Sequence, residues 1–222
     1  GDIKSMIVFE INKKQIILQQ VTGNVEAKNI ERGVMASQIQ QGISKSPEIW
    51  LFQLVSKGQT MDDVIRHCVE CGVSRILPIL CNNSNKGSLD RIERWQRIIK
   101  EARQQSGSPI NTVVEHPLKI EDALALWNDY TKDKTHFQFV LHEMPQEKEF
   151  SIFSIKTKPQ VFAYAVGNEG GIPSEILQDF LHNDFNVLHF NTNVLRVDTA
   201  CTYGLAVLQY AFTEFDLWQF KE

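Results

Sequence analysis

The chain has 222 residues and a net charge of −4, with 42% hydrophobic and 23% charged residues. This composition is that of a globular protein and excludes long disorder. The acidic balance excludes a protein that coats nucleic acid through its overall charge. No apolar run is long enough to span a bilayer, the N-terminus lacks a secretory pattern, and there are four cysteines. We therefore expect a cytoplasmic protein with no membrane partner and no structural disulfides.

The first 46 residues differ from the rest of the chain. Two short strands are predicted, Ile7–Ile11 and Gln15–Gln20, around a polar turn. The stretch from Gly23 to Ser46 is polar and has no strong period. We expect residues 1–46 to form a small β-rich appendage and residues 47–222 to form the main domain.

From Glu48 onward, short apolar runs alternate with segments of helical spacing. The predicted strands are Ile49–Val55, Val73–Leu80, Asn111–Glu115, Phe137–Leu141, Val161–Val166 and Val187–Phe190. The predicted helices are Thr60–Cys71, Ser88–Gln105, Ile120–Tyr130, Pro173–Leu181 and Asp198–Phe212. This alternation favours an α/β fold with a mostly parallel sheet and helices on both of its faces.

Polar residues and glycine mark the expected helix ends. Thr60 can cap the first of these helices, with two aspartates in the following turn, and Gly72 can terminate it. Asp198 and Thr199 stand in capping range at the start of the last helix.

The first candidate site is the segment Ala165–Glu175, where an apolar strand runs into three glycines within five residues and then into a helix. Glycine lets the backbone turn with positive φ and lets a ligand approach the main chain. The following helix N-terminus offers free N–H donors. The spacing is neither that of a Rossmann fingerprint nor that of a P-loop. On this segment alone, a ligand-binding loop and a tight turn without a ligand are equally open.

The second candidate site is the segment Phe190–Ala200, in which a strand end, a polar loop and a helix start follow one another. Taken alone, it indicates no more than a capped helix with Arg196 in a surface ion pair.

Together the two segments resemble a known signature. The pattern G-x-E-G-G from Gly167, followed by N-V-L-R-x-D-T-A from Asn193, is similar to that of the SPOUT methyltransferases. It is most similar to their RsmE branch, whose members make 3-methyluridine in small-subunit ribosomal RNA. Upstream, K-G-x-x-M from Lys57, I-L-P from Ile76 and R-W from Arg94 resemble further motifs of that family, in the same order. The resemblance extends from about residue 48 to residue 210.

This resemblance implies an α/β domain with a C-terminal trefoil knot, and an N-terminal PUA-like region that is incomplete in this chain. It also implies a homodimer with its cofactor sites near the subunit interface. The implied function is S-adenosylmethionine-dependent methylation of N3 of a uridine, with small-subunit ribosomal RNA, or the small ribosomal subunit itself, as the partner.

The resemblance also implies the site residues. The expected cofactor-binding residues are Leu141, Gly167, Gly170, Gly171, Ile172, Phe190, Asn191, Val194, Leu195 and Ala200. Arg196 would stabilise negative charge that develops on the base. Glu169 or Asp198 could assist the loss of its proton.

Five positions depart from the family pattern. Asn168 replaces a proline, Asn193 an arginine and Asp198 a glutamate, and His67 and Ser108 stand where a lysine and an arginine are usual. The three lost cations would weaken RNA contact or catalysis more than cofactor binding. Phosphate is held by cations, whereas adenosine is held mainly by backbone and apolar contacts.

Arg94, Arg97 and Lys100 form a candidate RNA-binding patch, because they would lie opposite the apolar side of their helix and face solvent. A solvated helix face balanced by neighbouring glutamates is the simpler interpretation. Cys68 and Cys71 form a C-x-x-C pattern. They lie within a predicted helix without further ligands, which indicates core packing rather than zinc, and no metal site is expected.

Two other functions remain open. A catalytically weak, cofactor-binding knotted protein that acts through RNA binding or dimerisation is favoured by the lost cations. A nucleotide- or dinucleotide-binding enzyme would bind NAD or ATP, and no matching fingerprint supports it.

Overall fold

The computed structural model describes residues 6–11, 16–20, 46–81, 91–145 and 150–215. The chain divides into two compact units, Gly1–Lys45 and Ser46–Glu222. In the first unit, strands β1 (Met6–Ile11) and β2 (Ile16–Gln20) pair antiparallel, which confirms the two predicted strands. The expected turn between them, and the polar stretch that follows up to Lys45, lie outside the described residues.

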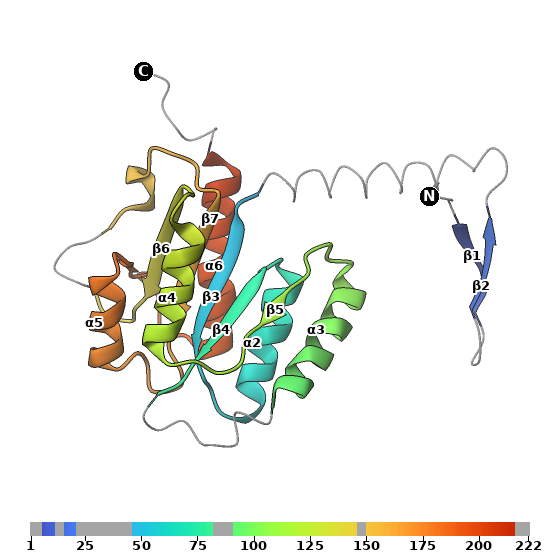
Figure 1. Ribbon diagram of the computed structural model, residues 1–222, viewed down its shortest axis with the longest axis horizontal. Helices are drawn as coiled ribbons and strands as arrows, with labels where there is room; N and C mark the ends of the chain where they lie inside the picture. Colours follow the sequence, from blue (N-terminus) through green and yellow to red (C-terminus); the bar gives the residue numbers. More distant parts are fainter. Residues whose placement is uncertain (1–5, 12–15, 21–45, 82–90, 146–149, 216–222) are drawn as a thin grey trace. The chain divides into compact units, whose positions relative to one another are not determined.

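The second unit is built on a six-stranded parallel sheet (Figure 1). Its strands are β3 (Glu48–Leu54), β4 (Arg75–Ile79), β5 (Val113–Val114), β6 (His136–Leu141), β7 (Val161–Val166) and β8 (Asn186–Leu188). Their order across the sheet is β5-β4-β3-β7-β6-β8, and every neighbouring pair is parallel. The predicted parallel sheet is thus confirmed.

Alternate residues of strand β3 belong to two different cores. Ile49 and Leu51 pack in one core, whereas Trp50, Phe52 and Leu54 pack in the other. Successive side chains of a strand point to opposite faces of the sheet. A strand that is buried on both faces therefore reads as a continuous apolar run, which is the pattern that predicted β3.

Helices cover both faces of the sheet, as predicted (Figure 1). On one face lie α2 (Gly58–Glu70), α3 (Ile92–Ser106) and α6 (Val197–Thr213). On the other lie α4 (Ile120–Thr131) and α5 (Ser174–His182). A short 3-10 turn, η2 (Ile152–Ser154), precedes β7. No helix in the described part of the chain is long and apolar enough to cross a membrane.

Helix α2 begins two residues earlier than predicted. Lys57 is its N-cap residue, and no side-chain cap is present, so Thr60 lies inside the helix and does not cap it. A distant contact takes over part of this role: the Lys57 N–H donates a hydrogen bond to Glu169 Oε1 at 3.1 Å. Gly72 follows the end of the helix with a φ of 82°, as expected of a terminating glycine.

The prediction that Asp198 or Thr199 caps α6 is also wrong. The N-cap residue is Arg196, and no side chain caps the helix. Asp198 lies in the first turn and faces the pocket described below. The predicted beginning of α3 at Ser88 lies outside the described residues.

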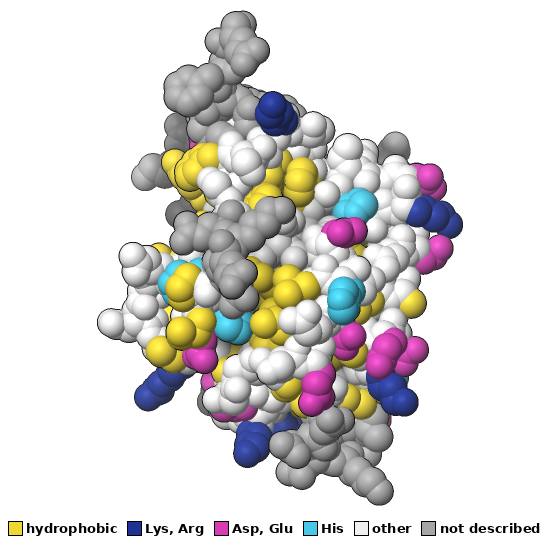
Figure 2. Space-filling view, turned by 90° about the vertical axis from the view of Figure 1, so that its left-hand side faces the viewer, with side chains coloured by type: hydrophobic (Ala, Val, Ile, Leu, Met, Phe, Trp, Pro, Cys, Tyr) yellow, Lys and Arg dark blue, Asp and Glu magenta, His cyan; other side chains and the backbone are white. Residues whose placement is uncertain are grey.

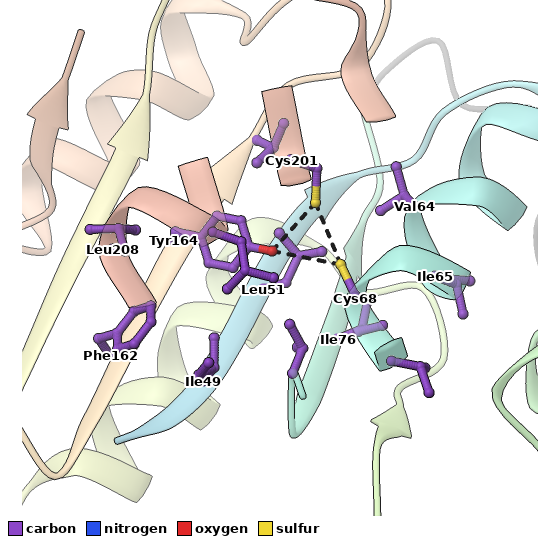
Figure 3. Close-up of a cluster of buried hydrophobic side chains, with 14 of the residues drawn as sticks. Ile49, Leu51, Val64, Ile65, Cys68, Ile76, Phe162, Tyr164, Cys201 and Leu208 are labelled. Atoms are coloured by element: carbon purple, nitrogen blue, oxygen red, sulfur yellow. Dashed lines mark hydrogen bonds between the residues drawn. The ribbon is translucent and has the colours of Figure 1, made fainter. Parts of the chain in front are cut away.

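Two thiols and a phenol meet in the core between α2, β7 and α6 (Figure 3). Cys68 Sγ lies 3.5 Å from Cys201 Sγ and 3.6 Å from the Tyr164 hydroxyl, and that hydroxyl lies 3.4 Å from Cys201 Sγ. All three side chains are buried. Cys71 is partly buried and packs against the same core. The C-x-x-C pattern therefore contributes to packing, as predicted.

Candidate active site

Three loops meet at the carboxyl edge of the sheet, following the neighbouring strands β6, β7 and β8. Together with the first turns of α2 they enclose a pocket of about 650 Å³. In open parallel sheets, ligands bind outside the carboxyl ends of the strands. A pocket of this volume suits a small organic ligand.

Most of the residues expected at the site line this pocket. They are Leu141, Gly167, Glu169, Gly170, Gly171, Ile172, Phe190, Val194, Leu195, Arg196, Asp198 and Ala200. Asn191 is not among the lining residues, and neither are Arg94, Arg97 and Lys100. His142 and Glu143, which follow β6, also line the pocket.

Sequence reasoning missed the wall that α2 contributes. Gln59, Thr60 and Asp63 of this helix line the pocket. The K-G-x-x-M motif from Lys57 was the available signal, because it places a family motif at the start of this helix.

The glycine loop after β7 is folded back on itself. The Gly171 N–H donates to the Asn168 carbonyl at 2.9 Å, and the Gly170 N–H donates to Asn168 Oδ1 at 2.9 Å. Gly171 has a φ of 77°, which favours glycine. A Cβ atom on Gly167 would lie 2.6 Å from the Gly171 carbonyl carbon, so only glycine fits at residue 167.

Gln53 holds this loop from inside the sheet. Its side chain is fully buried in β3, and Nε2 donates to the Gly167 carbonyl at 3.0 Å and to the Leu54 carbonyl at 2.9 Å. Sequence reasoning did not single it out. The available signal was one amide inside an otherwise apolar strand, since a buried polar side chain needs hydrogen-bond partners.

The loop after β8 and the start of α6 form the opposite wall. Phe190 lines the pocket and makes an edge-to-face contact with Tyr203 of α6, with 5.2 Å between ring centroids. Leu141 reaches the pocket from the end of β6. It packs so closely against α6 that a Cβ atom on Gly204 would overlap with Leu141 Cδ1.

The described lining is rich in carboxylates. They are Asp63, Glu143, Glu169 and Asp198, whereas the lining guanidinium is Arg196. The hydrogen bond from Gln59 lowers the pKa of Asp63, and Arg66, whose Nη1 lies 2.5 Å away, lowers it further. Asp63 is therefore ionised at neutral pH. Even with Arg66 included, the site has a net negative charge, which favours a cationic ligand.

The three residues of the expected RNA-binding patch differ in their surroundings. Arg94 Nε donates to Asp62 Oδ2 at 2.8 Å and Nη2 to the same oxygen at 2.5 Å, and the Asp62 side chain is only 3% exposed. Arg94 therefore joins α3 to α2, although more than half of its side chain is exposed. Arg97 and Lys100 are exposed on α3.

This chain is similar to known RNA methyltransferases. A family model described as an RNA methyltransferase domain matches residues 44–209. The ribosomal RNA small subunit methyltransferase E of Aquifex aeolicus is 25% identical, over 72% of this chain and 68% of the relative. The methyltransferase E 2 of Borreliella burgdorferi is 29% identical, over 76% of this chain and 68% of the relative.

A solved structure agrees with this fold. The crystal structure of a ribosomal RNA small subunit methyltransferase E from Neisseria gonorrhoeae bound to S-adenosyl methionine has a TM-score of 0.64 at 24% identity. The match covers 75% of this chain and 67% of that chain.

The parallel sheet, the pocket at its carboxyl edge and the matching family model define the class: the chain belongs to the RNA methyltransferase domain family. Within that family it is a divergent member of the ribosomal RNA small subunit methyltransferase E group. The resemblance found in the two sequence segments is thereby confirmed.

Proposed function

We propose that this chain methylates N3 of a uridine in small-subunit ribosomal RNA, with S-adenosylmethionine as the methyl donor. The pocket carries the proposal, because both segments that resemble the methyltransferase signature converge on it from the loops after β7 and β8. The relatives named as ribosomal RNA small subunit methyltransferases support ribosomal RNA as the substrate.

The pocket suits S-adenosylmethionine in size and charge. This cofactor supplies an electrophilic methyl group on a positively charged sulfur and also carries an ammonium group, which the net negative lining complements. We assign its binding to the lining residues Leu141, Gly167, Gly170, Gly171, Ile172, Phe190, Val194, Leu195 and Ala200. Asn191 lies in the same loop outside the lining, and we assign it no direct contact.

Calorimetry with S-adenosylmethionine tests this site. A Gly170→Arg substitution would place a long cationic side chain at the pocket wall, and we expect it to abolish binding. Unchanged affinity would remove the proposed cofactor site.

Methyl transfer to a ring nitrogen is a direct displacement, so positioning the reactants and excluding water supply most of the rate enhancement. The uridine N3 carries a proton, whose loss leaves negative charge on the base. Arg196, exposed at the pocket, would stabilise that charge. One of two carboxylates that line the pocket, Asp198 or Glu169, would accept the proton. Methyl transfer at the normal rate by Arg196→Ala would exclude a chemical role for Arg196.

A target base inside a stem would have to unstack, so an unpaired uridine is the expected substrate. We propose that the exposed Arg97 and Lys100 contact RNA phosphates, and that Arg94 contributes mainly by orienting α3. Lys100 also lines a shallow groove with Arg103, and the residues that line this groove include no carboxylate.

Several features expected from the family are part of the same proposal. These are a trefoil knot in the C-terminal part, a PUA-like role for the N-terminal region, a cytoplasmic location and a homodimer. Exposed Val194, Tyr203 and Tyr210 support the homodimer, because a second copy would cover them. Figure 2 shows apolar side chains gathered in the middle of one face, with lysine and arginine at its margins. Sedimentation analysis of the wild type and of Tyr210→Arg would test the dimer.

The decisive experiment is mass spectrometry of ribosomal RNA from cells with and without this protein. Loss of 3-methyluridine from the small-subunit RNA is the expected result. The second candidate function, a catalytically weak cofactor-binding protein, is favoured by Asn193, which lines the pocket where the family has an arginine. Cofactor binding without methyl transfer to ribosomal RNA or 30S particles would select that function.

A further inference from the structure

We infer that Glu169 is a positioning residue that fastens the glycine loop to helix α2, and that it is not the proton acceptor. This inference rests on the proposed function and divides the roles of the two carboxylates that the pocket offers, Glu169 and Asp198.

The first observation is a hydrogen bond across the pocket. Glu169 Oε1 accepts the Lys57 N–H at 3.1 Å, and Lys57 is the N-cap residue of α2. No side chain of the helix's own N-terminal residues caps it. The N-terminus of a helix carries partial positive charge, which stabilises a carboxylate placed there. The Glu169 side chain therefore occupies a favourable position that leaves one carboxylate oxygen engaged.

The second observation is what this bond connects. Gln59, Thr60 and Asp63 of α2 form one wall of the pocket, and the loop from Gly167 to Gly171 forms another. The loop's other described hydrogen bonds run to Gln53 in β3, run from Asn168 Nδ2 to Cys81 Sγ at 3.9 Å, or stay within the loop at Asn168. Between residues 167–171 and helix α2, the Glu169 bond is the one that the described part of the chain contains. Its loss would allow these two walls to separate.

The third observation concerns the alternative carboxylate. Asp198 lines the same pocket from the first turn of α6, and its carboxylate shares no hydrogen bond or ion pair with the described residues. Asp198 can therefore accept a proton without releasing a structural contact. The geometry assigns the structural role to Glu169 and leaves Asp198 for the chemistry.

The test compares Glu169→Gln with Glu169→Ala. A glutamine keeps an oxygen that can accept the Lys57 N–H but cannot act as a base at neutral pH, whereas alanine loses both properties. In steady-state methyl transfer to 30S particles, we expect Glu169→Gln to keep kcat within about threefold of wild type. We expect Glu169→Ala to raise the KM for S-adenosylmethionine about fivefold, the size of effect that one lost hydrogen bond produces. Asp198→Asn should instead lower kcat and leave that KM little changed.

A second measurement does not depend on activity. The Lys57 amide should exchange with solvent about fivefold faster in Glu169→Ala than in wild type, and at a nearly unchanged rate in Glu169→Gln. If Glu169→Gln loses most of its kcat while its Lys57 amide stays protected, the carboxylate takes part in the chemistry and the inference is wrong. Equal Lys57 exchange in all three proteins would also overturn it. Absence of methyl transfer by the wild type would contradict the proposed function, and the exchange rates would still decide the role of Glu169.

Discussion

At the scale of single residues, Asn168 shows how a departure from a family pattern can keep a loop in shape. The family has a proline at this position. In this chain the Asn168 side chain accepts the Gly170 N–H and its carbonyl accepts the Gly171 N–H. Asparagine side chains commonly stabilise tight turns in this way. The substitution therefore supplies an additional acceptor that a proline side chain lacks.

Two glycines of this loop should respond differently to alanine. In Gly167→Ala the new Cβ atom would lie 2.6 Å from the Gly171 carbonyl carbon, so the loop has to move. In Gly170→Ala its nearest neighbour is Asn168 Oδ1 at 3.4 Å. We expect Gly167→Ala to weaken S-adenosylmethionine binding at least about tenfold, a loss of about 1.4 kcal/mol, and Gly170→Ala to weaken it far less. Calorimetry on both variants would check this, and equal affinities would contradict it.

The sequence identified the glycine loop because three closely spaced glycines after an apolar strand are a local pattern. The role of Gln53 in holding this loop could not be predicted from the sequence, for a physical reason. Its function depends on reaching the Gly167 carbonyl, which follows strand β7 and lies far away in the chain. Local spacing carries no information on such a pair unless the strand order is known.

At the scale of elements, the sequence predicted nearly every strand and helix, because both faces of the sheet are buried and leave regular apolar patterns. The ends were harder to predict. The start of α2 is set partly by Glu169, and the last described strand, β8, ends at Leu188, two residues before the predicted end. At α2, a contact from a loop far along the chain outweighs the local capping signal of Thr60.

The contact between α2 and α3 predicts different effects for two neighbouring arginines. Removing Arg94 would leave the buried Asp62 carboxylate without its partner, so we expect Arg94→Ala to lower the free energy of unfolding by about 1–2 kcal/mol, less than for a fully buried pair because Arg94 is largely exposed. Arg97→Ala should change it by less than about 0.5 kcal/mol. Urea unfolding of both variants measures this, and similar values for the two would contradict it.

The thiols that join α2 to α6 should be unreactive in the folded protein. Burial raises the pKa of Cys68, and Cys201 beside it is also buried. Burial also raises the pKa of the half-buried Cys71 and Cys81. The thiolate is the reactive form, so a raised pKa means less of it at neutral pH.

Titration with an aromatic disulfide reagent should therefore show two slow thiols, Cys71 and Cys81, whose reaction speeds up with rising pH. Cys68 and Cys201 should react only after denaturation. Mass spectrometry of the labelled peptides identifies which thiols react. Four thiols that react at one rate in the folded protein would show that this core is open.

At the scale of the whole molecule, the charge of the pocket predicts ligand discrimination. S-adenosylmethionine carries one more positive charge than its demethylated product, so the net negative lining should favour the donor over the product. Because added salt screens such attraction, we expect the affinity for S-adenosylmethionine to fall with ionic strength more steeply than that for the product.

Two variants that each remove one negative charge, at different places, make this test more specific. Glu143→Gln removes a carboxylate from the lining, whereas Glu70→Gln removes one at the far end of α2. Glu143→Gln should reduce the difference in affinity between S-adenosylmethionine and its product, and Glu70→Gln should leave that difference unchanged. Equal effects of both variants would show that overall charge, and not the pocket, determines the preference.

The strand order also determines when the site can come into existence. Strand β3 pairs with β4, which follows closely in the chain, and with β7, which is made much later. At roughly 5–20 residues per second, a ribosome needs several seconds to proceed from Ile79 to Val166. During that interval one edge of β3 is without its neighbour. Because the pocket requires loops that are made later still, the cofactor cannot guide the early stages of folding and can stabilise only a chain whose last helix has already docked.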